Sequence, residues 1–509
     1  MRIQRRVPPP DAGDSLLDLP PLLRRLYLSR GVRHSSEVDP DLSRLLRPEP
    51  LSGLEQAVDL LEGALRRRER ILVVGDYDAD GATACALAVL VLRALGAAWT
   101  GFLTPNRFEF GYGLSPPLVD LAAGQRPDLL VTVDNGIASL AGVERANSLG
   151  MRVLVTDHHL PGDQLPAAAA ILNPNLADDA FPSKHLAGVG VVFYLLSALR
   201  ARLRAGGWFA AQQRAEPRLA DYLDLVALGT VADVVPLDAN NRVLVEQGLR
   251  RIRAGRCRPG ILALLRVAGR DPERLAGADL GFVVAPRLNA AGRLEDMSQG
   301  VQCLLAEDPD QALALAQTLD DLNRERRRIE AEMGDQAQTL LTDLALDQEG
   351  LPRGLCLFDY HWHQGVIGIL AARLRERWHR PVIALAEGEG DYLKGSARSV
   401  PDLHIRDALA TLDARHPGLL ERFGGHAMAA GLSLHRDRWQ EFARAFDQEV
   451  RRRLGDQPPE AELISDGPLA ASDLTLDQAR LLRYAGPWGQ GFPPRAIALS
   501  RRWQGDALG

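Results

Sequence analysis

The sequence predicts an α/β protein in which a doubly wound parallel sheet is joined by a long helix to a second, smaller α/β domain. From about residue 51, apolar runs of about five residues alternate with helical segments of about 12–15 residues, the pattern of a buried parallel sheet. A highly charged helical stretch begins at residue 309, and a shorter alternation of strands and helices follows between about residues 350 and 455.

The composition is that of an ordinary globular chain. Its 509 residues, 46% hydrophobic and 25% charged, are enough for about three domains and exclude a mostly disordered or fibrous protein. The longest uncharged, mostly apolar run, residues 186–199, is shorter than the ~20 residues of a membrane helix, and the amino terminus lacks the apolar region of a secretory signal. Four cysteines without a CxxC pair indicate reduced thiols, so we expect a cytoplasmic protein.

The net charge of −6 at pH 7 does not by itself indicate a nucleic-acid binder. Only two of the 60 basic residues, Lys184 and Lys394, are lysines. Codon bias in a GC-rich genome is the favoured explanation, although arginine also binds phosphates with two parallel hydrogen bonds. A mildly acidic total can hide a basic groove if carboxylates crowd into a metal site.

The predicted elements of the first half follow from short apolar runs and capping residues. Residues 1–50 are Pro-rich and irregular, and we expect an arm packed on the body with short helices such as 22–28. The β-strands are predicted at 71–74, 99–103, 129–133 and 152–156. The helices are predicted at 82–95 and 138–149, each ended by a glycine, and at 186–205 and 220–229.

The second half begins with a long helix. Asp308 supplies its N-cap and Pro309 its first residue, and it is expected to continue to about residue 346. Because its middle is highly charged, we expect it to bridge two domains. Beyond it, we expect strands at 355–358 and 382–385, a helix after Gly368, a glycine-rich segment at 424–431 and a helix near 476–484.

Acidic and imidazole side chains follow the ends of several predicted strands. They are Asp76, Asp78 and Asp80 after the first strand, Asp134 after another, Asp157, His158 and His159 after a third, and Asp233 after a further apolar segment. Because ligands bind beyond the carboxyl ends of parallel strands, we expect the set to share one crevice. Each residue alone has a structural explanation, such as a turn or a helix cap. Together, so many carboxylates would repel one another unless a cation neutralised them.

The type of these side chains predicts the metal. Carboxylate oxygens and imidazole without thiolate favour Mn²⁺ or Mg²⁺ over copper or structural zinc. The carboxylates exceed what one ion needs, so we expect two divalent cations about 3.5–4 Å apart. Such a pair clamps the attacking and leaving oxygens of a phosphoryl transfer and activates a water as the nucleophile.

The motifs, in this order, resemble a known family. DYDADG, VTVDNG, TDHH and GTVADVVPL are similar to the four phosphoesterase motifs of the DHH superfamily. The segments TPNRFEFGYGLS, APRLNAAGRLEDM, WHQGVIGILAARL, GSARSV, FGGHAMAAG and GPWGQGF are similar to its bacterial single-strand-specific 5′→3′ DNA exonucleases, from about residue 50 to 493. The resemblance implies a DHH domain, a DHHA1 substrate-binding domain, and hydrolysis of single-stranded DNA to 5′-mononucleotides in recombination and repair.

The resemblance also implies a role for each residue at the strand ends. Two Mn²⁺ or Mg²⁺ ions would be held by Asp76, Asp78, Asp80, Asp134, His158 and Asp233. Asp134 would bridge the ions, and Asp157 would orient an imidazole, as metal-bound histidines commonly require. His159 would contact the scissile phosphate and stabilise its developing charge. Related families often carry histidine in place of Asp76, which leaves an indirect contact open there.

Other motifs are implied to bind DNA. Arg107 would hold a phosphate and Tyr112 would stack a base, although Tyr112 could equally cap the core. In the small-residue turn PRLNAAGR, Arg287, Asn289 and Arg293 would approach the terminal 5′ phosphate, with Arg293 as the main contact. In the second domain, bare N–H groups of closely spaced glycines could meet an anion, or the glycines could form a tight strand-to-helix connection. The residues implied there are Ser396, Arg398, Gly424, Gly425 and His426.

We therefore expect five segments along the chain. These are an N-terminal arm (1–50), a DHH domain (51–305), a connecting long helix (306–347), a DHHA1 domain (348–456) and an OB-fold-like segment (457–509). The family continues after GQGFP into an OB-fold, but residues 494–509 show no alternating strand pattern, so we expect an incomplete barrel. The chemistry should survive this change, whereas the affinity for DNA should fall.

Three other functions can be weighed against this one. A related phosphodiesterase of short RNA or cyclic dinucleotides, or a manganese pyrophosphatase, would have a shorter chain without the insert that carries PRLNAAGR. A non-catalytic DHH-like scaffold would have lost metal ligands that are all present here. A Rossmann enzyme would need GxGxxG where this chain has GDYDADG. The expected partners are single-stranded DNA and, to supply the strand, a helicase and a single-strand-binding protein; we expect a monomer with no membrane contact.

Overall fold

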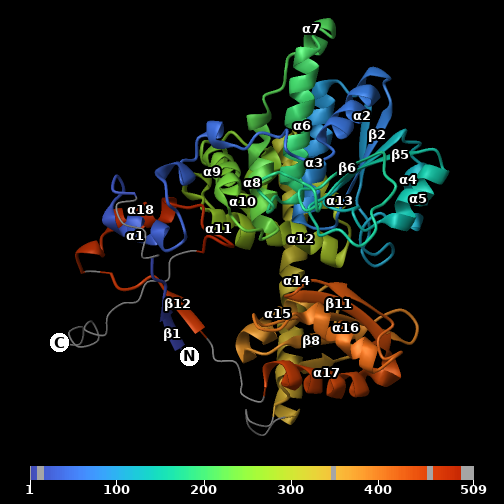
Figure 1. Ribbon diagram of the computed structural model, residues 1–509, viewed down its shortest axis with the longest axis vertical. Helices are drawn as coiled ribbons and strands as arrows, with labels where there is room; N and C mark the ends of the chain where they lie inside the picture. The colour runs from blue at the N-terminus through green and yellow to red at the C-terminus, as the bar shows by residue number, and fades with distance from the viewer. Residues whose placement is uncertain (1, 9–15, 345–350, 456–461, 470, 494–509) are drawn as a thin grey trace. The chain divides into compact units, whose positions relative to one another are not determined.

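The computed structural model describes residues 2–8, 16–344, 351–455, 462–469 and 471–493 (Figure 1). The described residues form two compact units. The first unit contains those of 5–323 and 465–493, and the second unit contains those of 2–4 and 324–464. Each unit has a five-stranded sheet with helices, so the predicted α/β class is confirmed.

The sheet of the first unit is parallel, with the strand order β3-β2-β4-β5-β6. Its strands are β2 (Arg70–Gly75), β3 (Trp99–Leu103), β4 (Leu129–Val133), β5 (Arg152–Thr156) and β6 (Ala170–Leu172). The four predicted strands are confirmed, and β6 is an addition. In the register, Gly75 pairs with Val133, Val133 with Thr156, and Thr156 with Leu172. The last residues of four strands therefore lie in one row.

Helices cover both faces of this sheet (Figure 1). They are α2 (Leu54–Arg66), α3 (Ala79–Leu95), α4 (Pro116–Ala123), α5 (Leu140–Ser148) and α6 (Gly188–Ala205). Ile71 and Val73 belong to the core that contains α2, α3 and α6, whereas Leu72 and Val74 belong to the core that contains α4 and α5. Because successive strand residues point to opposite faces, an unbroken apolar run such as ILVV requires cover on both sides.

Further helices of the first unit follow α6 in the chain. They are α7 (Trp208–Ala211), η3 (Leu219–Tyr222), α8 (Leu223–Ala232), α9 (Ala239–Arg253), α10 (Pro259–Val267), η4 (Pro272–Arg274), α11 (Gly277–Asp279), the π-helical turn η5 (Leu280–Val284), α12 (Ala285–Leu294) and α13 (Ser298–Leu305). Of these, α8, α12 and α13 pack against α3. The turn predicted at PRLNAAGR is wrong, because these residues form α12. Pro286 lies in the first turn of α12, directly after the π-helical turn η5.

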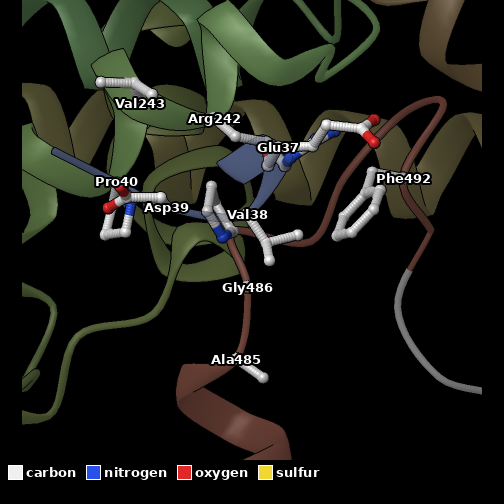
Figure 2. Close-up of a pocket in the computed structure, with 10 residues that line it drawn as sticks. Glu37, Val38, Asp39, Pro40, Arg242, Val243, Ala485, Gly486 and Phe492 are labelled. Carbon is white, nitrogen blue, oxygen red and sulfur yellow. The ribbon is translucent and has the colours of Figure 1, made fainter. Parts of the chain in front are cut away.

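From Leu16 on, the described amino-terminal arm packs on the body of the first unit, as predicted. This part contains α1 (Pro21–Leu28), η1 (Ser35–Glu37) and η2 (Leu42–Arg44). The strand β1 (Arg2–Arg5) precedes it, and most of β1 belongs to the second unit. The hydroxyl of Tyr27 donates a hydrogen bond to the carbonyl oxygen of Ala485 over 2.7 Å. Figure 2 shows a narrow cavity nearby, where the guanidinium of Arg242 lies 4.3 Å from the ring centroid of Phe492. These contacts hold the arm and the carboxy-terminal segment against α9.

The carboxy-terminal segment contains the helix predicted near residues 476–484. Its elements are β12 (Glu462–Ser465), which pairs with β1, η7 (Ala471–Asp473), α18 (Leu476–Tyr484) and a bridge between Gly489 and Phe492. Residues 494–509, on which the predicted incomplete barrel depends, lie outside the described residues. The barrel therefore stays a prediction.

The sheet of the second unit is mixed, with the strand order β10-β11-β9-β8-β7. The strands β7 (Leu355–Phe358) and β8 (Val382–Glu387) are parallel, and antiparallel pairs join β9 (Tyr392–Arg398), β10 (Arg422–Gly425) and β11 (Ala429–His435). The helices are α14 (Pro309–Leu344), which begins in the first unit, α15 (Ile367–Trp378), α16 (Ile405–Arg415), η6 (Arg436–Arg438) and α17 (Trp439–Leu454).

Most predictions for the second half are confirmed. Asp308 caps α14 by accepting the N–H of Gln311 over 2.9 Å. The helix is described to Leu344, and residues 345–346 of the predicted range lie outside the described part. The alternative of a tight strand-to-helix connection at the glycines is wrong, because Gly424 and Gly425 end β10 and pair with β11. Within the described ranges, no helix is long and apolar enough to cross a bilayer.

Candidate active site

The acidic residues converge because of the strand register. Asp76, Asp134 and Asp157 each follow a residue of the aligned row at the carboxyl ends of β2, β4 and β5. Asp134 has a φ of 62°, and Val234, directly after Asp233, has the same value. Left-handed backbone is costly for a residue with a side chain, above all for a β-branched valine, and it collects at functional sites.

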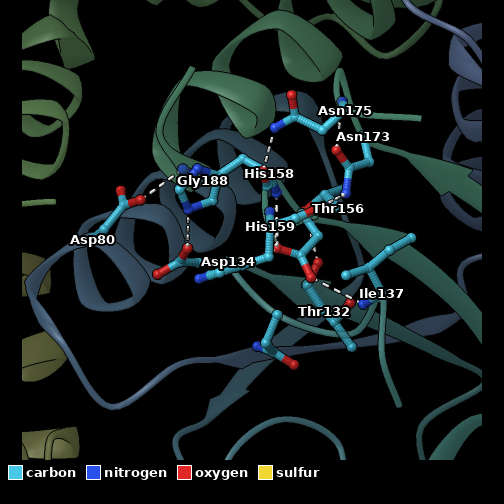
Figure 3. Close-up of polar contacts among 12 residues, drawn as sticks. Asp80, Thr132, Asp134, Ile137, Thr156, His158, His159, Asn173, Asn175 and Gly188 are labelled. Atoms are coloured by element: carbon cyan, nitrogen blue, oxygen red, sulfur yellow. Dashed lines mark hydrogen bonds and ion pairs between the residues drawn. The ribbon is translucent and has the colours of Figure 1, made fainter. Parts of the chain in front are cut away.

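The structure brings the six predicted metal ligands together. Three groups have ligand atoms within 4.8 Å of one another, namely Asp76–Asp78–Asp134, Asp80–His158–Asp233 and Asp134–His158–His159. Nε2 of His158 lies 3.1 Å from Oδ1 of Asp134 (Figure 3). The same atom lies 3.4 Å from Oδ2 of Asp233. Asp134 belongs to the first and third of these groups, and His158 to the second and third.

The cluster fits divalent cations in its charge and in its missing hydrogen bonds. Within the described residues, no hydrogen bond reaches the buried atoms Oδ1 of Asp76, Oδ1 of Asp134 or Oδ2 of Asp233. Burial and, after it, the charges of neighbouring aspartates raise the pKa of all three carboxyls. The same two causes raise the pKa of Asp80 to about 7. Buried carboxylates of this kind are stable as anions only beside cations, and hard oxygens with an imidazole suit Mn²⁺ or Mg²⁺.

Asp80 also anchors a helix to the cluster. Its two carboxylate oxygens accept the N–H groups of Gly188 (2.6 Å) and Val189 (3.0 Å) at the start of α6 (Figure 3). The close approach of α6 depends on glycine, because a Cβ on Gly188 would lie 2.5 Å from Cβ of Asp134. The amino terminus of α6 therefore directs its N–H groups and its positive end at the acids.

Asp157 orients one of the two neighbouring imidazoles. Its Oδ1 lies 2.8 Å from Nδ1 of His159 and accepts the backbone N–H groups of His158 and His159, while Oδ2 accepts the N–H of Ile137 over 2.9 Å. Burial favours a higher pKa for Asp157, but these bonds outweigh it and keep the pKa below its ordinary value. Burial favours a lower pKa for His159, but the bond to Asp157 outweighs that effect and raises the pKa of His159. Asp157 thus holds the ring of His159, whereas His158 faces Asp134 and Asp233.

Two asparagines that the sequence reasoning missed support the histidine pair. The side-chain amide of Asn173 donates to the carbonyl oxygen of His159 (2.9 Å), and that of Asn175 donates to the carbonyl oxygen of His158 (2.5 Å) (Figure 3). The ammonium of Lys184 braces the same loop by donating to the carbonyl oxygen of Pro174 over 2.8 Å. The sequence signal for both asparagines was the NPN triplet directly after β6. It was missed because β6 is short and follows an alanine run, so it was not recognised as a strand.

Two of the predicted DNA contacts of the first unit, Arg107 and Tyr112, lie in a chain of rings that leads to the acids. The guanidinium of Arg107 lies 4.3 Å from the ring centroid of Tyr77, whose ring contacts Tyr112 edge-on at 6.2 Å. The hydroxyl of Tyr112 lies 3.1 Å from Nδ1 of His159. Tyr112 is 47% exposed, and its ring lies between those of Tyr77 and His159.

The residues of PRLNAAGR differ in their surroundings. Arg287 is buried and pairs with Asp320, its Nε lying 2.8 Å from Oδ1, so it is not presented as the expected phosphate contact. Asn289 accepts the N–H of Ala79, the first residue of α3, over 2.8 Å. Arg293 lies four residues after Asn289 and therefore on the same face of α12. Of the three, Arg293 remains the predicted phosphate contact.

The predicted DNA contacts of the second unit lie on three neighbouring strands. In the register, Gly424 of β10 pairs with Gly431 of β11, which pairs with Ser396 of β9. Arg398 donates from Nη1 to Oγ of Ser396 over 3.1 Å, and burial, followed by the charge of Arg375, lowers its pKa. The remaining two residues, Gly425 and His426, are exposed at the turn after β10.

Comparisons with known proteins agree with this geometry. Family models match residues 70–230 (DHH family, N-terminal domain) and residues 352–452 (DHHA1 domain). The chain is 57% identical over 483 residues to the single-stranded-DNA-specific exonuclease RecJ of Escherichia coli (strain K12), covering 95% of this chain and 84% of the relative. The crystal structure of RecJ in complex with Mn²⁺ from Thermus thermophilus matches with a TM-score of 0.82 and 34% identity, covering 98% of this chain and 69% of that one. A Mg²⁺ complex of RecJ from the same organism matches with a TM-score of 0.75 and 32% identity, covering 97% of this chain and 67% of that one. The chain belongs to the RecJ family of single-stranded-DNA-specific exonucleases.

Proposed function

We propose that this protein, a metal-dependent exonuclease of single-stranded DNA, degrades its substrate from the 5′ end and releases 5′-mononucleotides during recombination and repair. The observation that carries the proposal is the cluster of six predicted ligands with buried carboxylate oxygens that lack hydrogen bonds. We assign residues 51–305 to a nuclease domain, 306–347 to a connecting helix and 348–456 to a substrate-binding domain.

The acids and His158 would hold two Mn²⁺ or Mg²⁺ ions. Such a pair, when bound, lowers the pKa of the attacking water and neutralises the charge that develops on the scissile phosphate. Asp134 would be a central ligand of this set, because ligand atoms of Asp76, Asp78 and His158 lie within 4.8 Å of its own. The amino terminus of α6 keeps Asp80 in place through the N–H groups of Gly188 and Val189.

His159 would stabilise the transition state directly. Its Nδ1 is held by Asp157, so a protonated ring presents Nε2–H as the donor to a phosphate oxygen. The raised pKa of His159 favours that protonated form. Asp157 would act through this ring and not through a metal ion.

The DNA would be held by phosphate contacts and one stacked base. Arg107 and Arg293 would bind phosphates and Tyr112 would stack a base in the nuclease domain. Ser396, Arg398 and the glycines of β10 would bind phosphate in the other domain. Because these contacts displace counterions from the DNA, the affinity should fall steeply with salt.

The setting of the reaction is also part of the proposal. A helicase would expose the single strand and a single-strand-binding protein would keep it accessible, and the enzyme would act as a monomer in the cytoplasm. The four cysteines are free thiols, which suits a reducing compartment.

The test is the digestion of oligonucleotides labelled at one end, single- or double-stranded, with Mn²⁺ or with EDTA. With single strands, we expect a 5′ label to appear at once as a mononucleotide, whereas a 3′ label should remain in a ladder of shortening strands. We expect no digestion of double strands, and none in EDTA instead of Mn²⁺. Early release of the 3′ label would overturn the polarity. Faster hydrolysis of a cyclic dinucleotide or of a two-residue RNA would instead favour the small-substrate alternative.

A further inference from the structure

The helix α12 contacts the loop that carries the first three acids. Oδ1 of Asn289 accepts the N–H of Ala79 over 2.8 Å, although the two residues are 210 positions apart. Ala79 is the first residue of α3, and Asp78 is its N-cap, whose own carboxylate accepts the N–H of Gly81. The first N–H groups of a helix have no partner inside it, so Asn289 completes a cap that Asp78 alone leaves incomplete.

A second contact from the same helix reaches the other side of Asp78. Gly292 lies three residues after Asn289 and thus on the same face of α12. A Cβ on Gly292 would lie 1.9 Å from the carbonyl oxygen of Tyr77, so only glycine permits this approach. Since Tyr77 and Ala79 flank Asp78 in the chain, α12 fixes the backbone on both sides of this acid.

The opposite face of α12 is anchored to the body of the first unit. Arg287 lies two residues before Asn289 and therefore points about 200° away from it. It is 8% exposed, its Nε lies 2.8 Å from Oδ1 of Asp320, and its Nη1 donates to the carbonyl oxygen of Val283 over 2.6 Å. The helix is consequently held from behind by a buried ion pair and presses its Asn289–Gly292 face on the acidic loop.

We infer that Asn289 is a positioning residue for the metal centre, which keeps Asp78 oriented so that it can share a cation with Asp76 and Asp134. The inference rests on the proposed function for the presence of the cation. It assigns Asn289 a task different from the phosphate contact that the motif led us to expect, because the side-chain oxygen of Asn289 is an acceptor in this bond and its partner is protein backbone.

The test compares two substitutions of Asn289 in the full chain. Asn289→Leu keeps the approximate shape and removes the acceptor, whereas Asn289→Asp keeps the acceptor. Mn²⁺ binding is measured by titration calorimetry without DNA, and kcat and KM are measured with a 5′-phosphorylated single strand at saturating Mn²⁺. Asn147→Leu is the matched control, because Asn147 also makes one side-chain hydrogen bond, to the carbonyl oxygen of Ala167, on the exposed surface of α5.

We expect Asn289→Leu to weaken Mn²⁺ binding by about 10–100-fold and to lower kcat, with KM for DNA changed by less than about threefold. Asn289→Asp should restore Mn²⁺ binding to within about threefold of the parent, and Asn147→Leu should change neither quantity. If Asn289 instead contacts phosphate, Mn²⁺ binding stays normal and KM for DNA rises in the leucine variant. KM then rises further in the aspartate variant, because a carboxylate repels the phosphate. That result would overturn the inference.

A substitute variant and a titration without turnover keep the test of Asn289 interpretable. If Asn289→Leu does not fold, as judged by circular dichroism, Asn289→Ser replaces it, because serine is too short to reach Ala79 and is well tolerated at a partly exposed position. The calorimetric titration needs no turnover, so it tests Asn289 even if the parent enzyme proves to degrade DNA from the other end. A failure of the proposed polarity and a failure of the positioning role are thereby separate results.

Discussion

The Nδ1 atom of His159 lies 2.8 Å from Oδ1 of Asp157, a buried carboxylate. Oδ2 of the same carboxylate accepts the N–H of Ile137, in the loop after β4. One buried side chain thus ties the imidazole that is proposed to meet the phosphate to the loop that carries Asp134. Its replacement should affect the reaction more than the binding of metal.

Asp157→Asn should lower kcat by about 10–100-fold while Mn²⁺ binding changes little. An amide has one acceptor oxygen where the carboxylate has two, so it cannot serve both His159 and Ile137, and the imidazole loses its fixed orientation. Steady-state kinetics and calorimetric Mn²⁺ titration measure the two effects separately. Asp163→Asn, at an exposed position of the following loop, is the control. A large loss of Mn²⁺ affinity in Asp157→Asn would show that Asp157 supports a ligand instead.

Asp134→Asn should abolish turnover and, in EDTA, leave the protein as stable as the parent or more stable. Burial and neighbouring carboxylates raise the pKa of Asp134, so its ionised form costs free energy at neutral pH, and a neutral amide removes that cost. Asparagine is preferred to alanine here because it tolerates the φ of 62°. Thermal unfolding with and without Mn²⁺ is the measurement.

The same experiment has a second expected result. The parent should gain about 2.7 kcal/mol of stability when Mn²⁺ is present at about 100 times its dissociation constant, and the Asp134→Asn variant should lose most of this gain. Full activity of the variant, or an undiminished Mn²⁺ stabilisation, would contradict the assignment of Asp134 to the metal centre.

Gly188→Ala should reduce turnover strongly without preventing folding. The new Cβ would lie 2.5 Å from Cβ of Asp134 and 2.8 Å from its Oδ1, so α6 or Asp134 must move. Gly190→Ala, two residues along the same helix, is the matched control, because its Cβ would meet the flexible end of Leu186 at 3.2 Å. Activity assays of both variants, with circular dichroism as a check of folding, decide the matter. Equal activities in the two would mean that close packing of α6 on Asp134 is unimportant.

The convergence of the acids could be predicted from the sequence because it depends on local patterns. Apolar runs of about five residues marked the strands, and the residues directly after parallel strands lie together at one edge of the sheet. The strand β6 escaped notice because it has three residues within an alanine-rich run, and with it the supporting amides of Asn173 and Asn175 were missed. Those bonds join segments that no local pattern connects.

The helix α12 was mistaken for a turn because its small residues serve a tertiary contact. Gly292 is required by the carbonyl oxygen of Tyr77, which lies far away in the sequence, and not by the local backbone, which is helical. Arg287 likewise matched a phosphate-binding pattern while its partner, Asp320, is another protein side chain. Composition and motif alone do not distinguish an arginine that binds a substrate from one that is already paired.

The stability of the second unit should depend on pH through Glu449 of α17. Its side chain is 2% exposed and accepts hydrogen bonds from Arg452 and Arg453. The two bonds from Arg452 and the one from Arg453, together with the charges of both arginines, outweigh burial and lower the pKa of Glu449 to about 2. Because the folded pKa lies below the ordinary value of 4.5, this stabilisation is fully present above pH 4.5 and is lost as the pH falls toward 2.

Glu449→Gln should therefore lower the free energy of unfolding by about 1–2 kcal/mol at pH 7. This is less than the full pKa shift would imply, because both guanidinium partners are partly exposed to water. The difference from the parent should shrink as the pH is lowered from 4.5 to about 3, where the parent carboxylate begins to take up its proton. Urea unfolding of both proteins at several pH values is the measurement. Glu441→Gln, also in α17, breaks an exposed pair with Arg438 of η6; it is the control and should have little effect. A difference between Glu449→Gln and the parent that stays constant across this range would mean that packing, and not the charge of Glu449, sets its contribution.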